Sequence, residues 1–234
     1  MRPRRAKIAK APFREFWLDI ILCCMDRAAS DVFTLFSGRI ALWIKIVYTV
    51  YVCVLVPIYV LHYPASNFLW FSDIALLTTV VALWLESPLL ASMMALAILL
   101  PELVWNLNFF FRLIFGIDRI GLSSYMFDPR IPLYVRALSL FHVVLPVLLV
   151  WMVYRLGYDR RALIAQTLTA MVVLPITYAV SDPADNINWV FGPGSKPQHY
   201  LPPPLYLAVL MIFLPLVIYL PTHWILSRLF AAKR

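Results

Sequence analysis

The sequence predicts an all-α, polytopic transmembrane helical bundle of about six spans, preceded by an amphipathic interfacial helix. The first observation is composition, since 63% of the 234 residues are hydrophobic and only 14% are charged. Soluble domains have about 45–50% apolar and about 25% charged residues. The second is the mean hydropathy of +0.83, and the third is a series of apolar runs of bilayer length. Together these observations exclude a soluble globular enzyme, a disordered chain and a coiled coil.

A spanning helix needs about 20 mainly apolar residues, and six segments meet that requirement. The predicted spans are Ile40–Leu61, Phe68–Leu85, Pro88–Leu107, Leu133–Leu156, Ala162–Val180 and Leu205–Leu226. They form a single transmembrane domain over residues 39–230, because no internal repeat divides it. Residues 231–234 form a short basic tail.

Residues 1–38 are predicted to form a basic tail and the amphipathic helix. Between Phe13 and Phe36, large apolar side chains alternate with Asp19, Asp26 and Arg27, a pattern that favours the headgroup layer over a seventh span. Eight of the twenty Lys and Arg residues lie in the first 39 positions. Such a tail is attracted to anionic lipid, so we expect membrane lipids as partners and no nucleic acid.

The positive-inside rule gives the expected orientation. With six spans, the N-terminal tail, the basic connection Arg155–Arg161 and the C-terminal tail lie on one side of the membrane, which we expect to be cytoplasmic. The connection after the third span places further arginines on the opposite side, where Asp118 and Asp128 are interleaved and can pair with them. The expected location is a bacterial inner membrane, with both termini in the cytoplasm.

The second long connection on that opposite, outer side reads SDPADNINWVFGPGSKPQHYLPPP over residues 181–204. Its Pro, Gly, Asp and Asn residues are typical of an ordered irregular loop. Loops of this length are uncommon and are usually functional lids or linkers. Because Trp189 and Phe191 are apolar, we expect the loop to pack down as a lid that carries Asn186 and Asn188.

Ionisable and polar residues inside spans are candidate functional groups, because each is costly in lipid. Near the predicted outer end lie Asp73 on the second span, Glu102 and Asn106 on the third, and Ser139 and His142 on the fourth. Spacings of three or four residues put each pair on one helix face. Pro101 and Pro146 remove backbone hydrogen bonds beside them, and an irregular backbone at membrane depth must line a cavity or be buried. The pattern predicts one outward-facing polar cavity.

This cavity has two predicted chemistries. Asp73, Glu102 and His142 are the expected catalytic residues, because a carboxylate–histidine pair can act as general acid and base. Asp128, His142 and Glu102 are the candidate ligands of a divalent metal ion, which would lower the pKa of bound water. The corresponding hypothesis is a metal-assisted hydrolase or transferase acting on a lipid or isoprenoid substrate. The sequence contains no His-Glu-x-x-His or Gly-x-Ser-x-Gly motif.

Three alternatives remain open from the sequence. In a purely structural role, Asp73 or Glu102 pairs with Arg112 or Arg136, and His142 contacts a carbonyl. In a small transporter, Glu86 and His223 meet near the inner side of the membrane and form the inner half of a polar path. In an accessory subunit of a membrane complex or a homo-oligomer, small residues such as Ala91 and Ala95 allow close helix contact.

Five short stretches together resemble an uncharacterised family of small bacterial multi-pass membrane proteins. They are NFLWFSD at Asn67–Asp73, YMFD at Tyr125–Asp128, SLFH at Ser139–His142, RLGYDRR at Arg155–Arg161 and NINWVFG at Asn186–Gly192. The resemblance covers the chain from the first span to the last and excludes the basic tail. It implies a bacterial multi-pass membrane protein and no particular activity.

Overall fold

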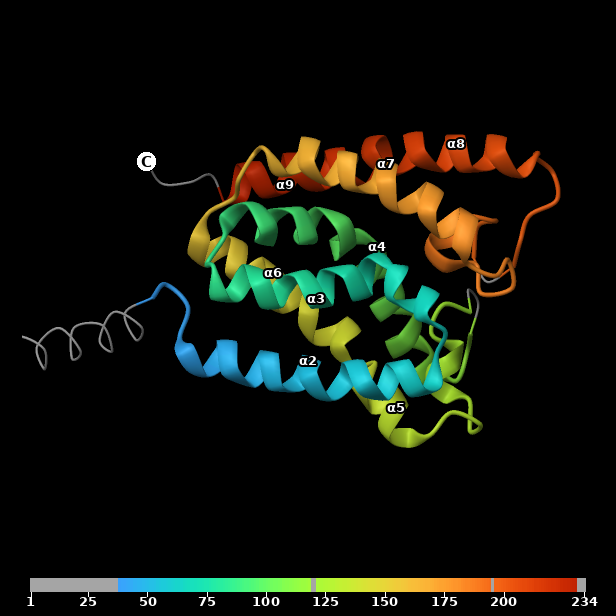
Figure 1. The fold of residues 1–234 in the computed structure, drawn as a ribbon, viewed down its shortest axis with the longest axis horizontal. Coiled ribbons are helices and arrows are strands. Elements are labelled where there is room, and N and C mark those ends of the chain that lie inside the picture. The colour runs from blue at the N-terminus through green and yellow to red at the C-terminus, as the bar shows by residue number, and fades with distance from the viewer. Residues whose placement is uncertain (1–37, 119–120, 195, 231–234) are drawn as a thin grey trace, which may run out of the picture.

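The computed structural model describes residues 38–118, 121–194 and 196–230, and all the regular structure in these ranges is helical (Figure 1). This confirms the predicted all-α helical bundle. The predicted amphipathic helix before residue 38 and the tail at 231–234 lie outside the described residues.

Within the described residues, five helices are long and apolar enough to cross a bilayer. They are α2 (Leu42–His62), α4 (Pro88–Phe115), the pair α5 (Leu133–Leu138) and α6 (Phe141–Leu156), α7 (Ala162–Val180), and the run formed by α8 (Pro203–Phe213), the π-helical turn η4 (Leu214–Tyr219) and α9 (Leu220–Leu229). Each of them begins within two residues of a predicted span.

The second predicted span is shorter than expected. Helix α3 (Phe71–Trp84) has 14 residues, which corresponds to about 21 Å, whereas the hydrocarbon core of a bilayer is about 30 Å thick. The residues before it form the 3₁₀ turn η1 (Ala65–Leu69), and the side chain of Asn188 accepts a hydrogen bond from the Phe71 amide at 2.9 Å. This contact holds the first turn of α3 in place, and Asp73 lies in that turn, at the end of the span where the sequence predicted it.

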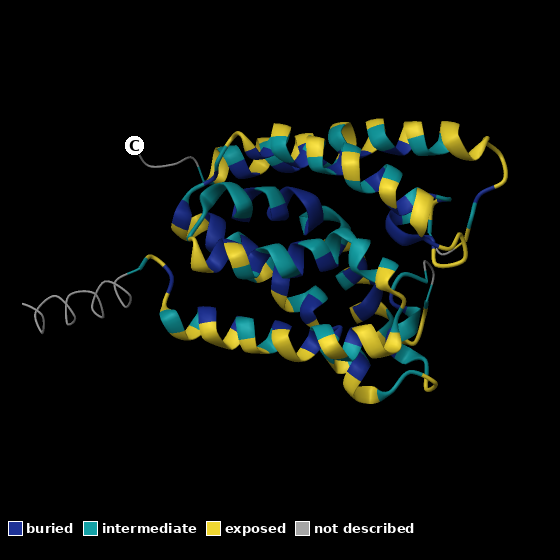
Figure 2. Cartoon of the chain, in the orientation of Figure 1, coloured by how far each residue is buried: buried dark blue, intermediate teal, exposed yellow. Residues whose placement is uncertain are grey.

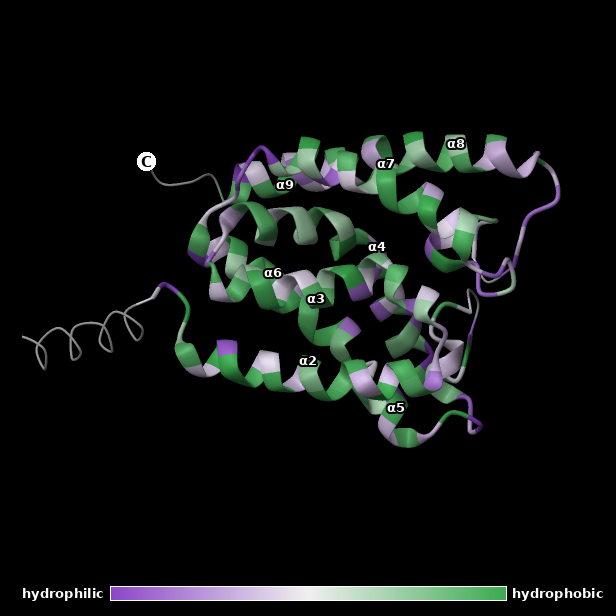
Figure 3. Cartoon of the chain, viewed as in Figure 1, coloured by the Kyte–Doolittle hydropathy of each residue, from purple (hydrophilic) through white to green (hydrophobic). Residues whose placement is uncertain are grey.

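Helix α4 is the central element of the bundle and packs against α3, α6 and α7. Ala91 and Ala95 in this helix are fully buried, as small residues at a close helix contact should be. The helix also extends to Phe115, eight residues beyond the predicted end at Leu107. Figure 2 shows buried positions facing the middle of the bundle, and Figure 3 shows that the outward surfaces of the helices are mostly apolar.

The two ends of the described chain lie at the same end of the bundle, together with the basic connection Arg155–Arg161 (Figure 1). The Arg39 carbonyl accepts hydrogen bonds from the Arg155 guanidinium, and the Tyr158 amide donates to the Phe230 carbonyl at 3.0 Å. We call this the basic end, and we call the opposite end, which carries residues 63–70, 116–132 and 181–202, the loop end. The basic connection therefore lies at the end of the bundle where the described chain begins and finishes.

Candidate active site

A cavity of ≈ 270 Å³ lies among the helices toward the loop end. Helices α2, α3, α4 and α6 contribute to its wall, as do the turn η4 and the two long connections. Its lining includes four residues that the sequence singled out as polar groups within spans, namely Asp73, Glu102, Ser139 and His142, and one from the predicted lid, Asn188. Chain topology therefore brings together the outer polar residues of three predicted spans.

A hydrogen-bonded Glu102–His142 pair joins α4 to α6. His142 Nδ1 lies 2.8 Å from Glu102 Oε1, and the two side chains are 14% and 6% exposed. The His142 ring stacks on Trp105, with ring centroids 4.6 Å apart, and on Phe141 at 4.1 Å. These two ring contacts and the hydrogen bond at Nδ1 fix the orientation of the imidazole. Within the described chain, Nε2 has no hydrogen-bond partner and so remains available to a ligand.

Asn106 holds the backbone on both sides of this pair. Its Nδ2 donates to the His142 carbonyl at 2.7 Å and to the Glu102 carbonyl at 2.8 Å. The His142 carbonyl needs a donor because Pro146, four residues later, has no N–H. Helices α4 and α6 are each continuous through their proline, so the proline frees a carbonyl that Asn106 then uses to join the two helices.

Two carboxylate oxygens in the cavity have no partner among the described residues. Asp73 and Glu102 are 3% and 4% exposed, and neither Asp73 Oδ1 nor Glu102 Oε2 receives a hydrogen bond. Leaving a buried polar group unpaired costs about 1–3 kcal/mol, and more when the group is charged. The cavity therefore presents acceptors that a ligand or water can satisfy.

The structural alternative, in which Asp73 or Glu102 pairs with Arg112 or Arg136, is wrong. Arg112 pairs with Asp118, and the Arg136 guanidinium donates to the Met126 carbonyl at 3.1 Å. Neither arginine lines the cavity.

Ser139 lies at a break between α5 and α6, where the sequence predicted one uninterrupted span. Its Oγ shares a 2.6 Å hydrogen bond with the Tyr59 hydroxyl, and the Tyr51 hydroxyl donates to the neighbouring Leu138 carbonyl. These hydroxyls on α2 satisfy groups that the break leaves free. The break also places Ser139, Phe141 and His142 on the cavity wall.

The loop at 181–204 closes one side of the cavity with Asn188 and Trp189. The Asn188 side chain bridges to the start of α3, since its Nδ2 donates to the Leu69 carbonyl at 2.7 Å and its Oδ1 accepts from the Phe71 amide. Asn186 does not line the cavity. Its side chain instead holds the loop together by bonding to the Gly192 carbonyl and the Phe191 amide.

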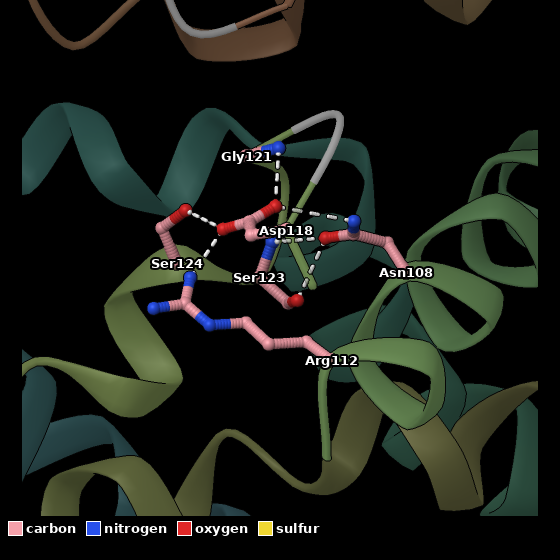
Figure 4. A network of polar contacts seen from close by, with 6 residues as sticks. All are labelled: Asn108, Arg112, Asp118, Gly121, Ser123 and Ser124. Carbon is pink, nitrogen blue, oxygen red and sulfur yellow. Dashed lines mark hydrogen bonds and ion pairs between the residues drawn. The ribbon is translucent and has the colours of Figure 1, made fainter. Parts of the chain in front are cut away.

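The connection after α4 is organised around Asp118 (Figure 4). The Asp118 carboxylate accepts hydrogen bonds from the Ser124 hydroxyl, the Gly121 amide and the Asn108 side chain, and it pairs with Arg112. These contacts, among which the Ser124 hydrogen bond has the largest effect, hold the pKa of Asp118 below its usual value. The network fixes the segment that places Leu122 and Tyr125 on the cavity wall.

The predicted metal site is not assembled, which corrects the sequence hypothesis. Asp128 lies outside the cavity lining and pairs with Arg130 at 2.6 Å, an interaction that lowers the pKa of Asp128 to about 2. In the ranges that the structure describes, no group of three or more His, Cys, Asp and Glu residues is placed to hold a metal ion. His142 and Glu102 lie together, but Asp128, the third predicted metal ligand, pairs instead with Arg130, its near neighbour in sequence.

The proposed inner pair does not form either. Glu86 accepts hydrogen bonds from the Arg39 and Ile40 amides and from Lys45 Nζ, the last at 2.8 Å. The His223 ring instead lies 2.7 Å from the Tyr158 hydroxyl. Both residues are therefore occupied by contacts that tie together segments at the basic end.

Several aromatic residues of the cavity wall were not predicted from the sequence. Tyr59, Tyr63, Trp105, Tyr125 and Tyr219 line the cavity, although aromatic residues near span ends are usually interfacial anchors. Only Trp105 has a local indication of this role, since it follows Glu102 by three residues and so shares its helix face. The others reach the cavity through tertiary packing.

Comparison with known proteins identified no matching family model, no matching curated protein and no matching solved structure.

Proposed function

We propose that this protein is a membrane-embedded hydrolase or transferase that uses His142 as its acid–base group on a lipid or isoprenoid ester. The observation that carries the proposal is the Glu102–His142 pair on the wall of a cavity that also contains Asp73. Pairing of a histidine with a carboxylate is the usual way to orient a catalytic imidazole. The five long apolar helices support a membrane location, where amphiphiles are the abundant substrates.

The proposed reaction needs only a proton relay through one imidazole. With Nδ1–H donating to Glu102, Nε2 is the basic nitrogen. It accepts a proton from water or an acceptor hydroxyl while the oxygen of that molecule attacks the ester centre. As the ester bond breaks, the imidazolium returns the proton to the leaving oxygen, so protons balance without another donor. Glu102 stabilises the imidazolium in between, and Asp73 adds negative charge to the same cavity.

A metal ion is not required by this scheme. Glu102 and His142 supply two ligands, whereas catalytic zinc sites use three protein ligands and a water. Elemental analysis of the purified protein tests the metal-assisted form directly, and a stoichiometric metal that is lost in His142→Ala would favour that form.

The test is turnover by the full-length protein in liposomes that contain mixed ester and isoprenoid lipids, followed by mass spectrometry of the products. We expect His142→Ala to reduce the rate by roughly 10²–10⁴-fold, the usual contribution of general acid–base catalysis. His62→Ala is the matched control, because His62 lies at the loop end, contacts Tyr134 and does not line the cavity. Equal turnover by wild type and His142→Ala, or no product from any lipid, would contradict the proposal.

We further infer that the basic end faces the cytoplasm of a bacterial inner membrane. The support is the positive-inside rule, applied to the arginine-rich connection at 155–161 and the chain ends beside it. At the loop end, Arg112 and Arg130 are paired with Asp118 and Asp128, which reduces the positive charge that opposes this orientation. The resemblance to small bacterial membrane proteins is consistent with this location.

A further inference from the structure

The described wall of the cavity contains two acidic residues, and its one histidine, His142, is hydrogen-bonded to one of them, Glu102. Asp73 and Glu102 each present an unpartnered oxygen there, and none of the lining residues in the described chain is Lys or Arg. A phosphate or carboxylate head placed in this cavity would lie beside two acidic side chains, with no Lys or Arg to neutralise it. A cationic head would instead balance the negative charge that these side chains carry when ionised.

Aromatic rings form a large part of the remaining wall. Tyr63, Trp70, Trp105, Tyr125 and Trp189 come from different segments and line the same cavity. Aromatic faces attract organic cations, and cages of such rings are the recurring binding site for quaternary ammonium groups. Carboxylates combined with aromatic rings thus favour an ammonium group over a metal ion, for which no three-ligand group exists in the described residues.

An apolar groove adjoins the cavity and shares Leu122 and Trp189 with it. The groove has a volume of ≈ 390 Å³ and lies between Val104 on α4 and a row of residues on α8 that comprises Tyr206, Val209, Leu210 and Phe213. Val104, Val209 and Phe213 are also exposed on the outer surface of the bundle. The groove therefore connects the cavity wall to the surface that lipid chains would cover.

We propose that the site binds a long-chain amphiphile with a cationic ammonium head. The head occupies the cavity beside Asp73 and Glu102, and the hydrocarbon chain lies in the groove between α4 and α8. This inference rests on the proposed function, for which it names the substrate class. Leu122 and Trp189 line both spaces, so the two lie side by side, and this adjacency is what assigns one molecule to both.

The head-group test compares three probes with the same chain in uncharged maltoside micelles. Equilibrium binding of hexadecyltrimethylammonium to wild type should be tighter than that of hexadecanol or hexadecyl phosphate by about tenfold or more. Asp73→Asn and Glu102→Gln should each reduce this preference, whereas Asp185→Asn, which removes an exposed loop carboxylate, should retain it. Equal binding of the three probes by wild type would overturn the proposal whether or not the variants fold.

The chain test uses one substitution in the groove. Val209→Trp should weaken binding of hexadecyltrimethylammonium by about tenfold and leave butyltrimethylammonium unaffected, because only the long chain reaches α8. Ile212→Trp is the matched control, since Ile212 is exposed on the same helix but does not line the groove. An equal effect of both substitutions, or no effect of Val209→Trp, would overturn the assignment of the chain.

These measurements separate the two proposals because binding does not require turnover. Ammonium-selective binding without turnover of any ester would contradict the proposed function and support the ammonium site. Turnover that depends on His142, together with wild-type binding that shows no ammonium preference, would support the function and overturn this inference.

Discussion

His142 shows how a single side chain can be held by groups that are distant in sequence. Glu102 bonds its Nδ1, Trp105 stacks on its ring, and Asn106 bonds its carbonyl. All three residues belong to two consecutive turns of α4, so one helix surface sets the position, orientation and tautomer of a residue on another helix. Preorganisation of this kind is what a general base needs.

The hydrogen bond to Glu102 predicts the neutral tautomer of His142. We expect Nδ1 to carry the proton in the wild-type protein, because only a donor at Nδ1 satisfies the carboxylate. In Glu102→Ala this preference should disappear. Nitrogen-15 NMR of histidine-labelled protein checks this, because the chain has only four histidines and His142→Gln identifies the resonance. A wild-type signal from an Nε2-protonated ring would contradict the prediction.

At the scale of elements, the loop-end connections are ordered by polar side chains rather than by a core of their own. Asp118 and Asn108 hold the segment that carries Tyr125, and Asn188 ties the long loop to the start of α3. Asn188 has a φ of 52°, in the left-handed region that asparagine tolerates better than most residues. These contacts convert two irregular connections into fixed cavity walls.

Asp118 should make this order depend on pH. Its folded-state pKa is lowered from 3.8, chiefly by the Ser124 hydroxyl, so its stabilising effect is complete above 3.8 and is lost as pH falls through the lower folded-state value. We expect the protection factors for amide exchange at Gly121–Phe127 to fall in acid. Asp118→Asn should show fast exchange at neutral pH already, and Asp182→Asn, at an exposed loop position, should behave as wild type. Unchanged exchange in Asp118→Asn would contradict the prediction.

At the scale of the whole molecule, the bundle separates two kinds of charge. The basic end holds both ends of the described chain and the 155–161 connection, whereas the acidic cavity opens toward the other end, beneath the two loops. Between the ends, the outward surfaces are apolar (Figure 3). A molecule of this form can insert in a bilayer in either direction, and the distribution of arginines decides which one.

Cysteine labelling tests the predicted topology. In a variant with Cys23, Cys24 and Cys53 replaced by Ser, Arg160→Cys lies at the basic end and Ala184→Cys in the long loop, both at exposed positions. In intact spheroplasts, an impermeant maleimide should label Ala184→Cys and should label Arg160→Cys only after lysis. Labelling of both before lysis, or the reverse order, would contradict the proposed orientation.

Much of the fold was predictable because a helix satisfies its backbone hydrogen bonds within its own segment. The hydrophobicity of its side chains can then be read from the local sequence. Runs such as 162–180 are mainly apolar, and their bounds agree with the helix in the structure. The short α3 was not predictable, because its start depends on Asn188, 117 positions away from Phe71 in the chain. The long α4 was missed because aromatic residues continue the helix past the expected end of the span.

By itself, the sequence determined the helical class, the approximate bounds of the helices and the candidates Asp73, Glu102, Ser139 and His142, because polar groups in an apolar segment are conspicuous. Tertiary structure decided which candidates meet. In the folded chain Glu102 pairs with His142, Asp128 pairs with Arg130, and Glu86 pairs with Lys45. Aromatic rings complete the cavity wall. The reason is physical. The free-energy cost of a polar side chain in lipid depends on that residue alone, whereas the group with which it pairs depends on how the helices pack.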